Sequence, residues 1–331
     1  MSETPVHPLP HAPAEGGADP VATAIAAAAQ AAQPRAPVTV AVVQAAPVSF
    51  DLPRTLEKVA ARTAEAAAHG AQLVLFPEAF VSAYPRGISF GAVVGHRTDE
   101  GRAWFQRYWQ SSITVPGPAV DALGAIARRH AVTLGIGVIE RDGGTLYCVL
   151  LVLGPDGALL AKHRKVMPTA SERLVWGFGD GTDVAVVDTP VGRVGGAICW
   201  ENYMPLLRHR LYAQGVELYL APTADARERW VASMRHIALE GRCFVLSANQ
   251  CTRRRDYPDD YPLEGVTDPD AVISRGGSCI VDPSGEVLAG PVYDEEAVLV
   301  ATLDPGAVVR GTFDFDAVGH YALVERMACG G

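Results

Sequence analysis

Short continuous runs of hydrophobic residues recur along this chain, separated by polar segments that contain glycine or proline. Such runs, rich in Val, Leu and Ile, are typical of buried strands, whereas longer segments with apolar residues three or four positions apart indicate helices. The pattern predicts strands at Val38–Gln44, Leu73–Phe76, Val132–Ile139, Tyr147–Leu153, Leu159–Arg164, Val184–Val187, Val194–Ile198, Leu218–Ala221, Phe244–Asn249, Ser278–Val281, Val287–Ala289 and Ala297–Leu303. It predicts helices at Thr55–Ala68, Val120–His130, Pro205–Ala213 and Glu228–Gly241.

Turn-forming sequences join several of these strands into hairpins. Gly154–Gly157, Pro190–Gly192 and Asp282–Gly285 each lie between two predicted strands. Because hairpins are mixed with strand–helix–strand alternation, the pattern favours a mixed sheet over an all-parallel one. Strands buried on both faces fit two sheets packed together with helices outside, although the pattern alone leaves a doubly wound sheet open.

The two ends of the chain differ in composition from the middle. Residues 1–37 are rich in Ala, Pro and Gly, so they cannot bury enough apolar surface to offset the entropy of ordering. We expect a disordered N-terminal tail there, in which Ala22–Ala32 could form a transient helix. Residues 38–321 are predicted to form one domain, and residues 322–331 a short C-terminal tail.

Composition and charge exclude several classes of protein. The formal net charge of −9 argues against a nucleic-acid partner, which requires clustered Lys and Arg. No apolar run reaches the roughly 18 residues of a membrane span. No Lys or Arg precedes Arg35, whereas a signal peptide begins with a positively charged segment. The six cysteines show no CxxC pairing. We therefore expect a cytoplasmic protein with free thiols.

Cys199 is the first candidate for chemistry. It lies where an apolar run gives way to the polar sequence Trp-Glu-Asn. A free cysteine is most often a small buried hydrophobic residue, but a thiol at the end of a strand can face a pocket and act as a nucleophile. An ordinary thiol is mostly protonated at neutral pH, so a nucleophilic cysteine needs a base or a cation nearby.

Glu78, Lys165 and Glu172 are the candidates for these supporting roles. Glu78 follows Pro77 among apolar residues, which suits a general base, although a surface or capping carboxylate is the ordinary alternative. Lys165 ends a basic cluster that could be only a solvated strand end, and we expect it to favour the Cys199 thiolate. Glu172 could pair with the next residue or cap a helix.

These segments together resemble the nitrilase superfamily of carbon–nitrogen hydrolases, and Cys-Trp-Glu-Asn at 199–202 resembles its nitrilase branch. The resemblance runs from Val38 to Tyr321 and includes Ser82–Gly87, Trp109–Pro118 and Phe313–Tyr321. It implies a mixed α/β fold of the four-layer α-β-β-α sandwich type.

The resemblance also implies roles for single residues. Cys199 would be the nucleophile, Glu78 the general base, and Lys165 the group that stabilises negative charge on the substrate. Glu172 would orient Lys165 or the substrate.

Two aromatic residues are candidates for the walls of the substrate pocket. We predict this role for Tyr84 and for Trp200, which adjoins the nucleophile, although either could be an ordinary core aromatic residue. His163 and His236 carry no metal-ligand pattern, and neither a P-loop nor a dinucleotide fingerprint is present. We expect neither a metal ion nor an organic cofactor.

The predicted activity is hydrolysis of an organic nitrile to a carboxylic acid and ammonia through a cysteine thioimidate and an acyl-enzyme. The partners would be a small-molecule nitrile and water, and the resemblance implies a homo-oligomer, either a dimer or a helical assembly. Residues 322–331 lack the Arg-Pro-acidic segment usual in family nitrilases. The alternatives are an amidase or cyanide-degrading enzyme of the same superfamily, or a non-catalytic assembly module.

Overall fold

The computed structural model describes residue 21, residues 23–25 and residues 34–322. The chain divides into two compact units, Met1–Arg35 and Ala36–Gly331, and the second carries the features described below. Most of the predicted N-terminal tail and nearly all of the C-terminal tail lie outside the described residues. In the described part of the chain, no helix is both long and apolar enough to cross a membrane.

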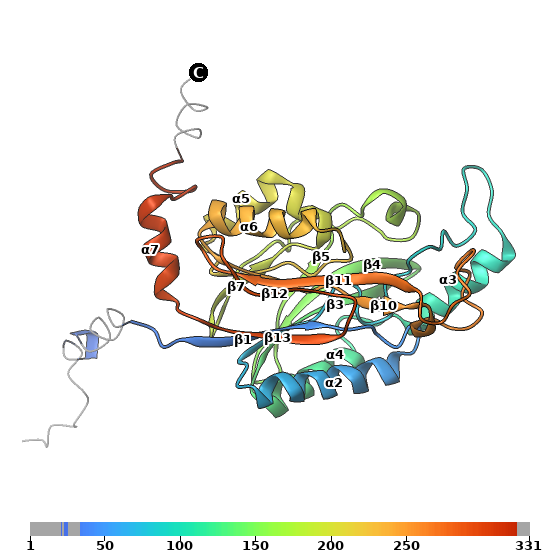
Figure 1. Ribbon diagram of the computed structural model, residues 1–331, viewed down its shortest axis with the longest axis horizontal. Helices are drawn as coiled ribbons and strands as arrows, with labels where there is room; N and C mark the ends of the chain where they lie inside the picture. Colours follow the sequence, from blue (N-terminus) through green and yellow to red (C-terminus); the bar gives the residue numbers. More distant parts are fainter. Residues whose placement is uncertain (1–20, 22, 26–33, 323–331) are drawn as a thin grey trace, which may run out of the picture. The chain divides into compact units, whose positions relative to one another are not determined.

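Two mixed sheets form the centre of the second unit (Figure 1). Within the described residues, the six-stranded sheet has the order β13-β1-β2-β3-β4-β5 and the seven-stranded sheet the order β10-β11-β9-β8-β7-β6, with β12 beside β11. The strands are β1 (Val38–Gln44), β2 (Leu73–Leu75), β3 (Thr133–Asp142), β4 (Thr145–Leu153), β5 (Leu159–Arg164), β6 (Val187–Thr189), β7 (Gly192–Gly196), β8 (Leu218–Leu220), β9 (Phe244–Ser247), β10 (Cys251–Arg253), β11 (Val272–Val281), β12 (Val287–Tyr293) and β13 (Ala297–Leu303).

Each sheet has three parallel strands at its centre and antiparallel strands beside them. β1, β2 and β3 are parallel in the first sheet, and β7, β8 and β9 are parallel in the second. The hairpins β3–β4, β4–β5, β6–β7 and β11–β12 are antiparallel. The prediction of mixed sheets is therefore confirmed.

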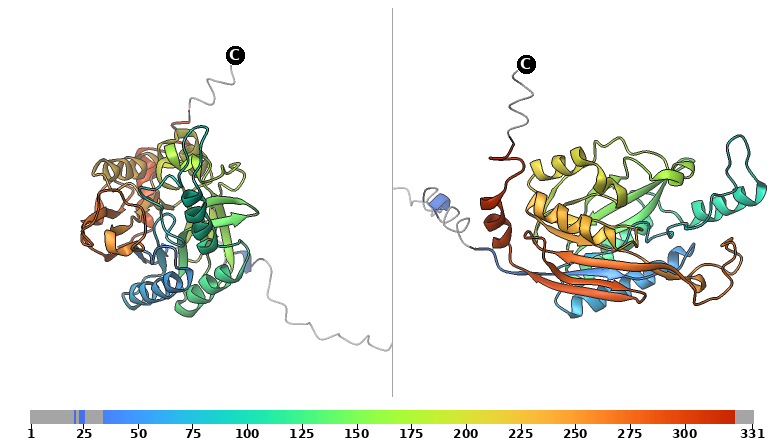
Figure 2. Two further views of the ribbon diagram at one scale, coloured as in Figure 1. Left: turned by 90° about the vertical axis from the view of Figure 1, so that its right-hand side faces the viewer. Right: turned by 45° about the horizontal axis from the view of Figure 1, so that its top comes forward.

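Helices cover the outer face of each sheet, as Figures 1 and 2 show. α2 and α4 pack on the first sheet, and α5 and α6 pack on the second. The helices are α2 (Leu52–Ala68), α3 (Asp99–Ser111), α4 (Pro118–His130), α5 (Pro205–Ala213), α6 (Arg229–Gly241) and α7 (Gly306–Asp314), and the 3-10 turns are η1 (Ala170–Leu174), η2 (Cys199–Tyr203) and η3 (Arg254–Asp256).

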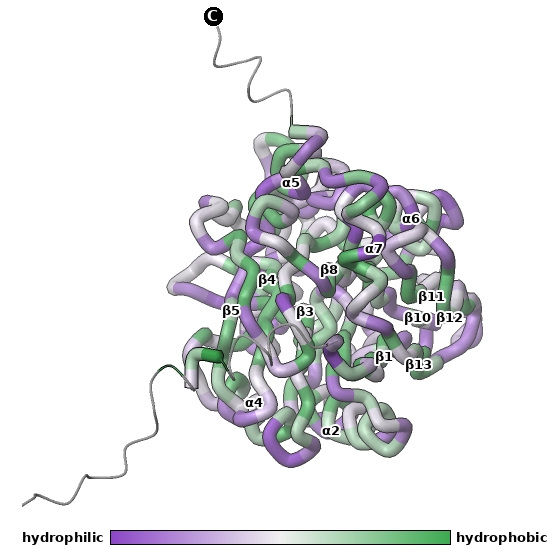
Figure 3. The backbone as a smooth tube through the Cα atoms, turned by 90° about the vertical axis from the view of Figure 1, so that its left-hand side faces the viewer, coloured by the Kyte–Doolittle hydropathy of each residue, from purple (hydrophilic) through white to green (hydrophobic). Residues whose placement is uncertain are grey.

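The alternation of side chains along each strand builds the core in layers. Val42 of β1 packs between the two sheets, whereas the next residue, Val43, packs beneath α2 and α4. In β8, Leu220 faces the other sheet and Tyr219 faces α5 and α6. Figure 3 shows the hydrophobic segments gathered in these central strands. Successive residues of a strand point to opposite faces of the sheet. Because both faces of these sheets are covered, the central strands must be apolar on both sides, which gives continuous hydrophobic runs.

The hydropathy pattern located most elements but missed or misplaced some. It gave no helix at α3, where Thr98 caps the helix by accepting from Gly101 N and two acidic residues open the first turn. It also gave no helix at α7. The strand before Cys199 ends at Gly196 and not at Ile198. Ile198 N donates to the Glu201 side chain instead of to a neighbouring strand.

Gly137 in β3 allows the turn that carries Glu78 to lie directly against the sheet. Gly137 N donates to Pro77 O at 3.1 Å, and Val81 N donates to Gly137 O at 3.1 Å. A Cβ atom on Gly137 would lie 2.3 Å from Pro77 O and 2.6 Å from the Glu78 Cα atom. Because both neighbours are backbone atoms, a side chain here must displace Glu78.

We expect Gly137→Ala to destabilise the fold by about 1–3 kcal/mol, as overpacking does, and to shift Glu78. Urea unfolding would measure the stability change, and turnover by the folded variant would report the shift of Glu78. Gly144→Ala is the matched control, because its Cβ would meet nothing within 4 Å. Equal stability and activity of the two variants would contradict this reading of the contact.

Candidate active site

The candidate residues stand at the ends of strands from both sheets. Glu78 lies in the turn after β2, and Lys165 directly follows β5. Cys199 opens η2, a short way beyond β7 in the second sheet. Cys199 has φ of +50°, a conformation that residues other than glycine seldom adopt, and its N–H donates to Pro222 O at 2.9 Å. Strained backbone of this kind concentrates at functional sites.

Lys165 joins the two carboxylates of the site. Its Nζ atom donates to Glu78 Oε1 at 2.7 Å and to Glu172 Oε2 at 2.7 Å. The side chains of Lys165 and Glu78 are fully buried, and that of Glu172 is 8% exposed. The structure thus brings Glu78 and Glu172 into direct contact with the buried ammonium of Lys165, which joins three of the four residues proposed for catalysis. Two carboxylates around one cation leave an excess of negative charge.

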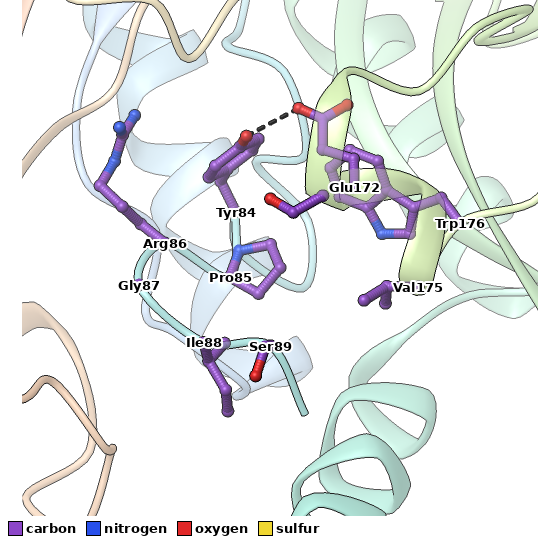
Figure 4. A pocket seen from close by; sticks show the side chains of 10 residues that line it. Tyr84, Pro85, Arg86, Gly87, Ile88, Ser89, Glu172, Val175 and Trp176 are labelled. Atoms are coloured by element: carbon purple, nitrogen blue, oxygen red, sulfur yellow. Dashed lines mark hydrogen bonds between the residues drawn. The ribbon is translucent and has the colours of Figure 1, made fainter. Parts of the chain in front are cut away.

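Glu172 caps the turn η1, one of the roles that the sequence left open, and also contacts Lys165. Thr169 N donates to Glu172 Oε2 at 2.6 Å, which caps η1, while the same oxygen receives Lys165. The other carboxylate oxygen accepts from the Tyr84 hydroxyl at 2.7 Å, the contact drawn as a dashed line in Figure 4. Glu172 is therefore fixed by a backbone donor, a cation and a phenol.

Burial and charge act in opposite directions on Glu78 and Lys165. Burial raises the pKa of the Glu78 carboxyl above its ordinary value; Lys165 opposes this shift and Glu172 adds to it. Burial alone would lower the pKa of Lys165, but the charges of Glu78, Cys199 and Glu172 outweigh it and raise that pKa well above its ordinary value. Lys165 accordingly stays an ammonium, while Glu78 is made a better proton acceptor.

The Cys199 thiol stays protonated in this site. Burial and the charge of Glu78 raise the pKa of Cys199 to about 12, although Lys165 and a hydrogen bond from Thr223 oppose the shift. Lys165 favours the Cys199 thiolate, but burial and Glu78 outweigh it, and the sequence does not reveal how fully the sulfur is buried. A nucleophile of this kind must give up its proton as it attacks.

The two oxygens of Glu78 have different surroundings. Oε1 accepts a hydrogen bond from Lys165 Nζ and another from the Cys148 thiol, whose sulfur lies 3.6 Å away. Oε2 is buried and has no hydrogen-bond partner among the described residues. Because buried carboxylate oxygens are normally paired, this unused acceptor marks the atom available for a proton.

Two cavities adjoin the site. One, of about 320 Å³, reaches Cys199, and the other, of about 420 Å³, is shown in Figure 4. Tyr84, Arg86 and Glu172 line both cavities. The residues around the first cavity are Tyr84, Arg86, Thr169, Glu172, Cys199, Trp200, Ala224, Asp225, Ala226 and Arg227. Both aromatic residues proposed as pocket walls thus line the same cavity as Cys199, and Trp200 is 41% exposed.

A buried network beside the site was missed by the sequence reasoning. His163 Nε2 lies 3.0 Å from Glu201 Oε2, and its Nδ1 lies 3.0 Å from Asp183 Oδ1. The hydrogen bonds and charges of the two carboxylates overcome burial and raise the pKa of His163 to about 9. The signal available was the strand alternation in β5, which turns His163 inward. No group in the described residues has the His, Cys, Asp and Glu geometry of a metal site.

The raised pKa of His163 gives a test based on stability. A folded-state pKa near 9 against an ordinary 6.5 means that the ion pairs contribute fully below about pH 6.5 and are lost as pH rises through 9. We expect the stability advantage of wild type over His163→Gln, measured by urea unfolding, to shrink between about pH 7 and pH 10. His236→Gln is the control, because the side chain of His236 lies on α6 and is 65% exposed. A constant advantage across this range would contradict the assignment.

Comparisons with known proteins agree with this geometry. The family described as carbon-nitrogen hydrolase matches residues 39–310. A bifunctional nitrilase/nitrile hydratase of Lupinus angustifolius is 57% identical over 292 residues, covering 87% of this chain and 84% of that protein. An aliphatic nitrilase of Sinorhizobium fredii is 55% identical over 282 residues, covering 85% and 91%.

Solved structures share the fold at low sequence identity. A carbon-nitrogen hydrolase from Helicobacter pylori has a TM-score of 0.68 and 18% identity, covering 88% of this chain and 98% of that chain. An amidase of the nitrilase superfamily from Nesterenkonia has a TM-score of 0.62 and 21% identity, covering 84% and 95%. With the family match across most of the chain, these findings show that the protein belongs to the carbon–nitrogen hydrolase family.

Proposed function

We propose that this protein is a nitrilase that hydrolyses an organic nitrile to a carboxylic acid and ammonia. The observation that carries the proposal is the arrangement of a protonated thiol, an unpaired carboxylate oxygen and a buried ammonium beside a cavity. Relatives that are more than half identical over most of the chain and carry the name nitrilase support the choice of substrate. No step requires a metal ion or an organic cofactor.

The first step is attack on the nitrile carbon. The sulfur of Cys199 forms a bond to that carbon while its proton passes to Glu78, whose free Oε2 is the acceptor. One bond of the carbon–nitrogen triple bond breaks, so negative charge develops on nitrogen. Lys165 is fully buried and fixed by its two carboxylate partners, so it stabilises that charge without reorganisation. Glu78 then gives the proton taken from Cys199 to the nitrogen, which leaves a thioimidate on Cys199 and restores the Glu78 carboxylate.

Two water molecules complete the reaction. Glu78 removes a proton from the first water, whose oxygen adds to the thioimidate carbon and gives a tetrahedral intermediate. The carbon–nitrogen bond breaks, ammonia leaves after protonation, and a thioester remains. The second water attacks the thioester carbon, the carbon–sulfur bond breaks, and the thiol of Cys199 is restored.

The same tetrahedral intermediate offers a second product. If its carbon–sulfur bond breaks in place of the carbon–nitrogen bond, the amide is released and the thiol regains its proton. The printed name of the lupin relative includes nitrile hydratase, which favours this branch as a second candidate activity. The partition depends on which leaving group is protonated first, and therefore on Glu78 and Lys165.

The assembly and location of the protein follow as further proposals. The family resemblance supports a homo-oligomer, and sedimentation velocity on the full chain measures its size. The cytoplasmic location stays a prediction from the composition and the cysteines.

The proposed function is tested by giving the enzyme a nitrile and its matching amide in parallel. We expect ammonia and carboxylic acid from the nitrile, with turnover abolished in Cys199→Ala because the covalent route is lost. Glu78→Gln should lower nitrile turnover by about 10²–10⁴-fold, since the glutamine side chain cannot accept a proton. Chromatography of acid and amide measures the partition between the two products.

The matched control is Cys279→Ala, which alters another fully buried cysteine, on β11. It should keep wild-type turnover and lose only stability. Cys148→Ala is unsuitable as a control, because the thiol of Cys148 contacts Glu78. Faster turnover of the amide than of the nitrile would favour an amidase, and ammonia release by Cys199→Ala at the wild-type rate would exclude the covalent mechanism.

A further inference from the structure

Glu201 connects the two segments that carry Cys199 and Lys165. Its Oε2 atom accepts from Ile198 N at 2.7 Å, and its Oε1 atom accepts from Val166 N at 2.6 Å. Ile198 directly precedes Cys199, and Val166 directly follows Lys165. One carboxylate thus holds a backbone N–H group next to each of these two residues.

These two segments belong to different sheets. Lys165 follows β5 at the edge of the six-stranded sheet, whereas Cys199 follows β7 in the seven-stranded sheet. No sheet ladder therefore sets the spacing of the ammonium and the thiol. Contacts that cross between the sheets must do so, and the hydrogen bond from Val166 N to Glu201 is such a contact, while the bond from Ile198 N ties Glu201 to the segment that carries Cys199.

His163 and Asp183 hold the Glu201 carboxylate in place. His163 Nε2 lies within 3.2 Å of both carboxylate oxygens, and its ring is fixed on the other side by Asp183. Asp183 also accepts from Arg164 N at 2.8 Å, so it is anchored to the strand that leads to Lys165. The side chain of Glu201 is fully buried and that of His163 is 6% exposed, so each charge needs the other.

Glu201 does not meet the substrate directly. It is not among the residues that line the cavity at Cys199, and both of its oxygens are already engaged by N–H groups and by His163. Any effect of Glu201 on the reaction must therefore pass through the position of its neighbours.

We propose that Glu201 is a positioning residue that fixes Cys199 relative to Lys165, with His163 and Asp183 keeping its carboxylate oriented. The inference rests on the proposed function, since it requires these two residues to act on the same substrate. Misplacement of reacting groups by about 1 Å costs on the order of 10²-fold in rate, so the two short hydrogen bonds carry a large kinetic effect.

The test is steady-state kinetics of Glu201→Gln with a nitrile substrate. The amide retains one acceptor oxygen, so one of the two N–H groups loses its partner and faces an NH₂ group instead. We expect kcat to fall by about 10²-fold, because alignment is lost, while KM stays nearly unchanged, because the cavity walls are intact.

Glu140→Gln is the matched control. Glu140 is an equally buried carboxylate that contacts the same strand, β5, but it pairs with the side chains of Lys162 at 2.9 Å and Arg164 at 2.7 Å. Its loss should lower the unfolding temperature and leave kcat unchanged. Glu201→Asp is the second variant should Glu201→Gln not fold, because it keeps the charge beside His163 but is too short for both N–H groups. It should show the same kcat loss.

Two results would overturn the inference. Glu201 variants that lose stability as Glu140→Gln does while keeping the wild-type kcat would make the residue purely structural. A rise in KM at unchanged kcat would assign Glu201 to substrate binding. Cys199→Ala, run in the same assay, separates the two proposals: if it stays active, the proposed function fails; if it is inactive, an unimpaired Glu201→Gln removes only the positioning role.

Discussion

The buried ammonium of Lys165 is the interaction on which the rest of the site depends. A fully buried cation is tolerated only with excellent partners, and breaking such a pair typically costs about 3–5 kcal/mol. Its partners Glu78 and Glu172 come from the turn after β2 and from η1. The need to neutralise one charge therefore fixes how strand ends from distant parts of the sequence meet.

The same excess of negative charge helps to keep the Cys199 thiol protonated. Two carboxylates and full burial keep Cys199 a thiol at rest, and Glu78 keeps one oxygen unpaired to receive the proton. The site therefore does not store a thiolate. In the proposed mechanism deprotonation is coupled to attack, so the reactive form of the sulfur is confined to the moment when an electrophile is bound.

Much of this could be predicted from local sequence, and the limits have physical causes. Glu78 and Cys199 stand where apolar runs end, and Lys165 stands at the end of a basic cluster that closes a predicted strand. The contact of Tyr84 with Glu172 spans 88 positions and joins segments that follow β2 and β5. The contact of His163 with Glu201 spans 38 positions and crosses from one sheet to the other, so both depend on the tertiary structure. The balance of burial and charge that sets the protonation of Cys199 could not be predicted for the same reason, because desolvation is a property of the folded interior.

The resting protonation state of Cys199 tests the central claim most directly. The ultraviolet absorbance of a thiolate can be isolated as the difference between wild type and Cys199→Ala, since the other cysteines and the tyrosines cancel. A titration from about pH 6 should show no thiolate step up to about pH 10, because burial and Glu78 hold the proton on sulfur. A step with a midpoint at or below about 8.5, the ordinary thiol value, would contradict a site that moves the proton only during attack.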